Sequence, residues 1–295
     1  MHWPRAKAYL IGAFVILDLF LGYQLWTQRQ QSRDSYFPAT TRYEQRQALA
    51  QLARANVAVD VMIPTKSDPM EWLVVGRPNI QPTDLERRFF PGETPELRRV
   101  SAAHGYRTYL LGLHSELSVF EDGRLEFKRY GIVPSPGNAL VDATRAKDEA
   151  AAFIKQYGGL PAEAVPDRVW FDPQAGIYHV TYYQEYQGKA QYGAKFEVLV
   201  SRDGQAYDIQ QTWPNPIGFE GPKKALLPAT DALLRLAGSL AREPSQDRMH
   251  VTGIGLGYYS QAYDSNRWSE PPVWRIQLGD GSVYHINAYT GQLEP

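Results

Sequence analysis

WRIQLGDGSVYHINAY (Trp274–Tyr289) alternates apolar and polar residues on both sides of an Asp-Gly pair. Asp-Gly between two alternating runs predicts a β-hairpin, because glycine accepts the positive φ that tight turns require. The same pattern occurs in LSVFEDGRLEFKRY (Leu117–Tyr130) and in FEVLVSRDGQAYDIQQ (Phe196–Gln211). The aspartates of the three pairs, at 122, 203 and 280, lie 81 and 77 residues apart. This near-equal spacing predicts repeated units of about eighty residues.

A segment with helical character precedes each hairpin. The three segments are Thr41–Asn56, Ala143–Tyr157 and Pro228–Arg242. In the second, Asp142 or Thr144 can cap the start, and Gly158-Gly159 can end it. Strand-like runs follow the second and third segments, at Ile177–Tyr186 and His250–Tyr259. The pattern predicts an α+β fold in which each unit lays a helix on an antiparallel sheet.

Clusters of proline and glycine divide the outer part of the chain. They occur at Pro134–Gly137 and at Trp213–Pro222. We therefore expect a first α+β domain at residues 36–135 and a second region at 139–295, made of units at about 139–218 and 223–295. The proline-rich stretch from residue 64 to residue 95 predicts long loops and edge strands within the first domain.

The N-terminal stretch AYLIGAFVILDLFLGYQLW (Ala8–Trp26) is a nearly continuous apolar run. At ~1.5 Å per helical residue it reaches roughly the ~30 Å of a bilayer's hydrocarbon core. A cleaved signal peptide is the alternative, but no pair of small residues of the A-x-A kind follows the run. We expect an uncleaved transmembrane anchor at 8–26. Arg5 and Lys7 favour a cytoplasmic N-terminus at residues 1–7, although the charge bias is small because two arginines follow the run.

Asp18 is the single charged residue within this run. A charge at the centre of a membrane helix costs ~2.5–3.5 kcal/mol on insertion scales, so it normally faces a protein partner or an aqueous cavity. On a helix, Asp18 shares a face with residues that would form the candidate intramembrane contact: Ile11, Phe14, Val15, Gly22 and Leu25. The alternative is a protonated or snorkelling Asp18 that the helix tolerates.

No pattern of catalytic or metal-binding residues emerges from the sequence. The chain has no cysteine, and its six histidines never fall at i, i+3 or i, i+4. A net charge of −1 argues against a nucleic-acid-binding protein. Gly253–Gly257 has the glycine spacing of a phosphate loop, but no helix follows it, which favours a glycine-rich strand. We therefore expect no catalytic residues, no cofactor and no metal.

The carboxylates and tyrosines of the sequence also indicate surface and sheet residues, not a catalytic site. Asp60, Glu71, Asp148 and Glu149 are assigned to the solvated surface, since nothing in the sequence brings two of them across a cleft. Alternating tyrosines such as those at 178 and 182 indicate one half-buried sheet face. A groove for a sugar or a peptide is the alternative interpretation of the tyrosines.

The N-terminus MHWPRAKAYLIGAFVILDLFLGYQLW (Met1–Trp26) resembles that of the YycI family, also called WalI. The helix-plus-hairpin units, including VYHINAYTGQLEP (Val283–Pro295), are similar to the PepSY-like extracellular modules of that family. The resemblance implies a single-pass membrane protein whose C-terminal part is extracellular. It also implies action with YycH on the sensor histidine kinase WalK (YycG) in cell-wall homeostasis signalling. Contacts between transmembrane helices would take part, which would give Asp18 a partner.

Two other functions are compatible with the modules. An anchored PepSY-like peptidase inhibitor or extracytoplasmic chaperone would bind a protease through the soluble part alone. A cell-wall hydrolase is disfavoured, because the sequence contains no nucleophile or metal constellation. A homodimer is compatible with the sequence as well.

Overall fold

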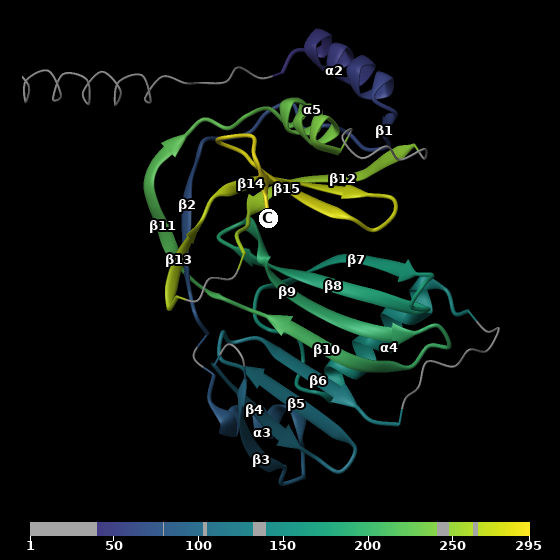
Figure 1. The fold of residues 1–295 in the computed structure, drawn as a ribbon, viewed down its shortest axis with the longest axis vertical. Coiled ribbons are helices and arrows are strands. Elements are labelled where there is room, and N and C mark those ends of the chain that lie inside the picture. Colours follow the sequence, from purple (N-terminus) through teal and green to yellow (C-terminus); the bar gives the residue numbers. More distant parts are fainter. Residues whose placement is uncertain (1–39, 79, 103–104, 132–139, 241–247, 262–264) are drawn as a thin grey trace, which may run out of the picture.

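The computed structural model describes residues 40–295, apart from 79, 103–104, 132–139, 241–247 and 262–264. The described chain has a mixed α+β fold, mostly sheet, and forms two lobes (Figure 1). The predicted anchor and the face around Asp18 lie outside the described residues. Within the described ranges, no helix combines the length and the apolar character that crossing a membrane requires.

One lobe, here the α4 lobe, comprises residues 82–212. Its antiparallel sheet has the strand order β3-β4-β5-β6-β10-β9-β8-β7, with α4 on one face. Its elements are α3 (Pro82–Phe89), β3 (Glu96–Ala102), β4 (Gly105–Leu111), β5 (Ser115–Phe120), β6 (Leu125–Arg129), α4 (Ala143–Gln156), β7 (Ala164–Asp172), β8 (Ile177–Tyr186), β9 (Lys189–Ser201) and β10 (Ala206–Thr212).

Helix α4 forms where the sequence predicts a helix, and for the expected reasons. The Asp142 side chain accepts a hydrogen bond from the Arg145 N–H at 2.8 Å. At the other end, Gly158 and Gly159 have positive φ, and the Gly159 N–H donates to the carbonyl of Ile154 at 2.8 Å. The helix buries one stripe against the sheet, formed by Ala146, Ala150, Phe153 and Ile154.

An aromatic cluster centred on Phe127 fills the core between α3, α4 and the sheet. Phe127 has no exposed surface. Its ring centroid lies 5.1 Å from that of Phe89 on α3 and 4.6 Å from that of Tyr157, just after α4. Because both helices contact this ring, Phe127 ties them to the β5–β6 hairpin.

The second lobe, here the α5 lobe, comprises residues 40–76 and 215–295. Helix α5 covers a sheet in which β12, β14, β15 and β16 are adjacent, and β1 joins β12 in parallel. A separate three-stranded sheet has the order β11-β2-β13. The elements are α2 (Arg42–Arg54), β1 (Val57–Val59), β2 (Met70–Gly76), β11 (Asn215–Lys224), α5 (Ala229–Leu240), β12 (Met249–Tyr258), β13 (Arg267–Glu270), β14 (Pro272–Leu278), β15 (Val283–Asn287) and β16 (Leu293–Glu294).

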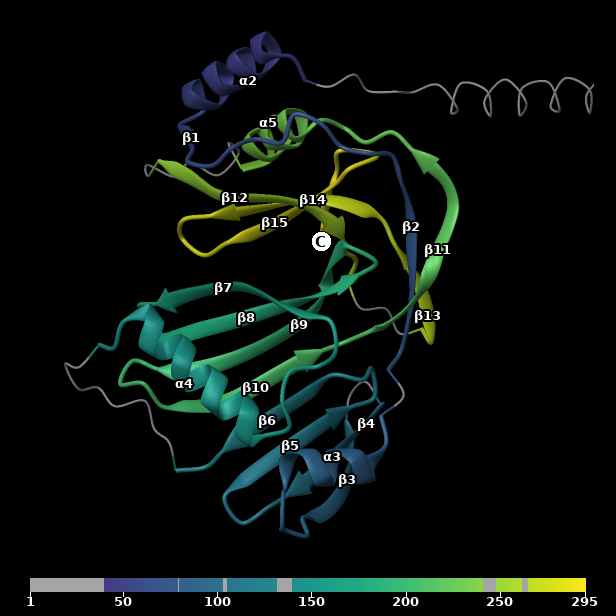
Figure 2. The same ribbon diagram turned by 180° about the vertical axis from the view of Figure 1, so that it is seen from behind.

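Strand β9 links the two lobes into one thirteen-stranded sheet. Most of β9 pairs with β8 and β10 in the α4 lobe. Its first residues pair in parallel with β12, with Ala190 opposite Gly257 and Gln191 opposite Tyr258. The helices α4 and α5 lie on the outer sides of the two sheet regions, so the inner sides face each other (Figure 2).

All three predicted hairpins are confirmed, at β5–β6, β9–β10 and β14–β15. In each turn the glycine, Gly123, Gly204 or Gly281, has φ between 88° and 93°. Its N–H donates to the carbonyl three residues earlier, at 2.9–3.1 Å. The same sequence signal therefore produces the same local geometry three times.

The N-terminal segment differs from its expected placement. Helix α2 forms as predicted, with Thr41 and Glu44 in a reciprocal capping box. However, it packs on α5 instead of accompanying the β5–β6 hairpin. Long loops and edge strands are expected in the proline-rich stretch 64–95, but β2 is the central strand of its three-stranded sheet and α3 also forms there. The cause is pairing of β2 with β11 and β13, which local sequence does not reveal. The division at residues 36–135 and 139–295 stays a prediction.

Candidate functional site

The inner sides of the two lobes meet through a buried ion pair between β7 and β14. The Nη1 and Nη2 atoms of Arg275 donate to the two carboxylate oxygens of Asp167 at 2.7 and 2.6 Å. Both side chains are about one-tenth exposed, at 11% and 10%. Burial raises the pKa of Asp167, but the hydrogen bonds and charge of Arg275 outweigh burial and hold that pKa below its usual value. The pair is therefore a charged, two-point contact between the lobes.

A second contact joins β7 to the turn of the C-terminal hairpin. Arg168 Nη2 donates to the carbonyl oxygen of Gly281 at 2.6 Å. The ring of Trp170 lies where a Cβ at position 281 would project, so this turn accepts only glycine without rearrangement. The Asp-Gly pair that defines the third hairpin therefore also provides a docking point for the α4 lobe. We call Asp167, Arg168, Trp170, Arg275 and Gly281 the lobe clamp.

Aromatic rings surround the clamp and line a cavity of about 220 Å³. The Arg275 guanidinium lies 4.8 Å from the centroid of the Tyr192 ring. The rings of Tyr259 and His285 stack with centroids 3.7 Å apart. Burial, with a smaller contribution from the charge of Arg275, lowers the pKa of His285 to about 3. His285 is therefore neutral at physiological pH.

The glycine-rich segment of the sequence lies beside this cavity. It is part of strand β12, as expected, and not a phosphate loop. A Cβ at Gly255 or Gly257 would collide with the Tyr192 side chain. These glycines therefore allow Tyr192 to lie close against the β12 backbone and place its ring under Arg275.

A row of paired polar side chains extends from the clamp across the α4 lobe. His179 stacks on Trp170 with ring centroids 4.2 Å apart, and its Nδ1 lies 2.9 Å from Glu197 Oε1. Lys195 Nζ donates to the other oxygen of Glu197 at 2.7 Å. Burial raises the pKa of Glu197, but its hydrogen bond with His179 and the nearby Lys195 hold that pKa below its usual value. These groups are mutually paired, an arrangement that suits a structural contact.

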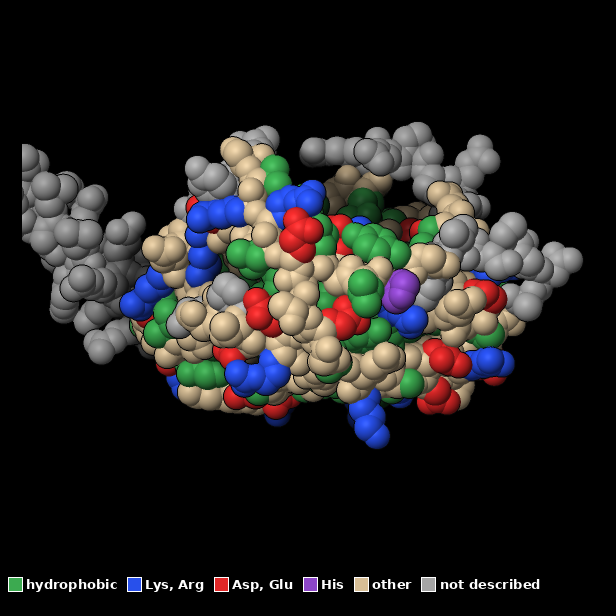
Figure 3. Space-filling view, turned by 90° about the horizontal axis from the view of Figure 1, so that it is seen from below, with side chains coloured by type: hydrophobic (Ala, Val, Ile, Leu, Met, Phe, Trp, Pro, Cys, Tyr) green, Lys and Arg blue, Asp and Glu red, His purple; other side chains and the backbone are tan. Residues whose placement is uncertain are grey.

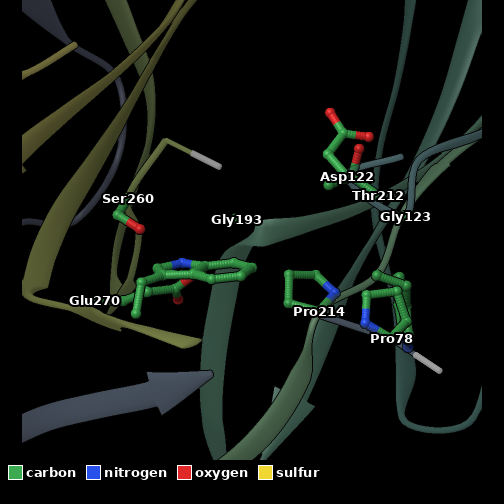
Figure 4. A pocket seen from close by; sticks show the side chains of 10 residues that line it. Pro78, Asp122, Gly123, Gly193, Thr212, Pro214, Ser260 and Glu270 are labelled. Carbon is green, nitrogen blue, oxygen red and sulfur yellow. The ribbon is translucent and has the colours of Figure 1, made fainter. Parts of the chain in front are cut away.

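A smaller pocket lies where the chain crosses between the lobes (Figure 4). Pro78 and Pro214 come from the two crossing segments, and Ser260 and Glu270 come from the α5 lobe. Gln191 Nε2 donates to Glu270 Oε1 at 3.3 Å, whereas Oε2 is buried without a hydrogen-bond partner. Burial raises the pKa of Glu270 to about 7. Throughout the described part of the chain, no three His, Asp or Glu side chains are grouped as a metal site would require.

The four carboxylates assigned to the surface are not brought together. Asp60 Oδ2 lies 2.8 Å from His250 Nδ1, with both side chains about half exposed. Glu71 lies on β2, and Asp148 and Glu149 lie on α4. The sequence did not single out Asp167, Arg275 or Glu270, because each partner lies 79 or more positions away in the chain.

Two helix-covered sheet regions, one with two Asp-Gly hairpins and the other with one, face each other across the lobe clamp and define a two-lobed α+β protein. Residues 172–289 match the family model described as YycI protein. The resemblance to the YycI family is confirmed for these residues, which include strands β8 to β15.

Comparison with solved structures finds an uncharacterized protein from Eubacterium rectale. The two chains are 12% identical, and the TM-score is 0.43. The match covers 81% of this chain and 89% of that chain. No curated protein matches the chain.

Proposed function

We propose that this chain is a non-enzymatic, membrane-anchored regulator of the sensor histidine kinase WalK (YycG), acting together with YycH in cell-wall homeostasis signalling. The observation that carries this proposal is the YycI family match over residues 172–289. Those residues contain Arg275, Gly281 and the part of β9 that links the lobes. The matched region therefore includes the α5-lobe side of the clamp, whereas Asp167, Arg168 and Trp170 on β7 precede it.

The proposed mechanism has a membrane part and an outer part. In the membrane, a helix at residues 8–26 would pack against the kinase and YycH helices through Asp18 and its face. Outside, the two-lobed domain would contact one signalling state of the kinase better than the other. Such a difference in affinity is what a partner needs to shift an equilibrium between two states. The buried clamp supports this role, because it joins the two lobes and a contact made by one lobe would therefore constrain the other.

Co-purification tests the membrane part. The full-length tagged chain is extracted from membranes, and WalK and YycH are quantified by mass spectrometry. The expected result is recovery of both proteins, with a strong reduction for Asp18→Leu. Phe20→Leu is the matched control, because position 20 lies on the opposite side of a helix from position 18. Equal recovery with wild type and Asp18→Leu would remove Asp18 from the contact.

Deletion of the gene tests the regulatory role. Transcription of WalK-dependent genes should change under cell-wall stress, and the full-length chain should restore it. An unaltered set of transcripts in the deletion strain would contradict the proposal. A purified chain that inhibits a protease would favour the peptidase-inhibitor alternative instead.

A further inference from the structure

The end of the molecule that carries α2 has an exposed surface with two parts. Figures 1 and 2 show α2 at one end of the long axis and β3 at the other. Only Ala48 and Leu52 of α2 are buried. Beside the helix, the segment after β1 forms a groove of about 540 Å³ lined by Gln45, Leu49, Val59, Val61, Met62, Ile63, Pro64 and Thr65.

The apolar part of this surface is unusually open to solvent. The side chain of Met62 is 94% exposed, and that of Tyr43 on α2 is 69% exposed. Leu49 on α2 lines the groove together with Met62 and is 37% exposed. A methionine so exposed next to an apolar groove is typical of a surface that something apolar covers.

The charged part lies on the adjoining face of α2. At ~100° per residue, Leu49, Arg42, Arg46, Tyr43 and Arg54 fall within about 140° of the helix circumference. This arc contains all three arginines of the helix and no acidic residue. Glu44, the one acidic residue of α2, lies outside the arc and is hydrogen-bonded to Thr41 at the N-cap.

The opposite end of the molecule differs in its charge pattern. Figure 3 looks onto that end and shows acidic and basic side chains interspersed over the surface. The face of α2, which combines apolar, aromatic and exclusively basic side chains, therefore differs from the end of the molecule that Figure 3 shows. Such a combination matches a surface with anionic head groups above an apolar layer.

The chain itself limits how far this surface can lie from a bilayer. Thirteen residues separate Trp26, the end of the predicted anchor, from Thr40. At ~3.3–3.6 Å per extended residue they span at most about 45 Å. Helix α2, the first described element after the predicted anchor, is therefore held within reach of the lipid surface.

We propose that the arginine face of α2 and the Met62 groove form a docking surface for an anionic lipid bilayer. The arginines contact head groups, while Met62, Leu49 and Tyr43 insert at the boundary of the acyl chains. This orientation directs β3 away from the membrane, so the two lobes stand upright on the α2 end. The inference rests on the proposed anchor, and the experiment below separates the two.

The absence of cysteine from the chain allows single-site labelling without background. The full-length variant Met62→Cys carries an environment-sensitive fluorophore and is reconstituted into phosphatidylglycerol vesicles that contain nitroxide-labelled lipid. Leu97→Cys on β3 is the control, because Leu97 is also exposed (56%) but lies in the lobe far from α2. The label at 62 should be quenched severalfold more strongly than the label at 97.

A charge variant tests the arginine face. Arg42→Gln with Arg46→Gln should reduce quenching at position 62 by roughly half, since each arginine adds electrostatic attraction near an anionic surface. Lys147→Gln with Lys155→Gln on α4 removes the same charge elsewhere and should leave quenching unchanged. In phosphatidylcholine vesicles, quenching at 62 should be weaker and insensitive to the arginine variant.

Vesicle flotation distinguishes the possible failures. A full-length chain that floats but shows equal quenching at 62 and 97 overturns the docking surface and leaves the anchor intact. A chain that does not float overturns both the anchor and the docking surface.

Discussion

The two lobes bury cores of comparable size but assemble them differently. The α4 lobe is formed by one continuous stretch, residues 82–212, and its neighbouring strands are mostly joined by short turns. The α5 lobe brings residues 52–75 together with residues 226–288 in one core. Its parallel β1–β12 pairing joins Val57 to Met249. The α5 lobe therefore depends on contacts that are distant in sequence, and such contacts form late because the loop between them must first close.

The largest expected difference between the lobes comes from Phe127→Ala. Removing this fully buried ring should lower the free energy of unfolding by about 3–5 kcal/mol. Hydrogen exchange should show the greatest loss of protection in β5, β6 and α4, because the ring belongs to that core alone. Leu233→Ala on α5 is the matched variant for the other lobe. Equal loss of protection in both lobes for either variant would show that the two cores unfold as one.

Breaking the lobe clamp should have the next largest effect. Asp167→Asn leaves the buried Arg275 without its charged partner and should cost about 2–4 kcal/mol, measured by urea unfolding. Glu96→Gln removes the partner of Arg98 in a surface pair in which both side chains are more than half exposed, and it should have almost no effect. Equal stabilities of the two variants would mean that the clamp does not stabilise the lobe contact.

The Glu270 pocket predicts a dependence of stability on pH. The pKa of Glu270 is about 7 in the folded protein and 4.5 is its ordinary value, so the folded protein retains a proton that the unfolded chain releases between these pH values. The contribution of Glu270 to stability is therefore fully present below pH 4.5 and is lost as pH rises through 7.

Glu270→Gln removes this titration. At pH 8 the variant should exceed wild type in free energy of unfolding by up to about 3 kcal/mol, and the gain should vanish near pH 4. Urea unfolding at both pH values measures it. A gain that is the same at both pH values would contradict titration of Glu270 as the cause.

The smallest effects should come from the helix caps, one in each lobe. Asp142→Ala removes the cap of α4, and Thr41→Ala removes the cap of α2. Each should cost about 1 kcal/mol locally. Because α4 lies on a core and α2 buries only two residues, Asp142→Ala should lower the global midpoint of thermal unfolding. Thr41→Ala should change only hydrogen exchange within α2. If Thr41→Ala lowered the midpoint of thermal unfolding as much as Asp142→Ala or more, α2 would be as integral to its lobe as α4.

The sequence predicts the local parts of both lobes. Helices α2, α4 and α5 form within the segments with helical character, and all three Asp-Gly hairpins form at their turn residues. Non-local pairing was not predictable in this way. The central place of strand β2 in its sheet is not evident until its partners β11 and β13 are known, and Asp167 meets Arg275 across 108 positions. The lobe clamp could not be predicted either, because its residues are distant in sequence and form no short motif.

Strand β2 has a consequence for biosynthesis. Its first partner in the sequence, β11, begins at Asn215, whereas β2 ends at Gly76. At ~5–20 residues per second, ribosomes need on the order of ten seconds to make the intervening chain. During this interval, the apolar strand MEWLVVG emerges with both edges unpaired. We expect nascent chains to need a holding chaperone until β11 and β13 have been made.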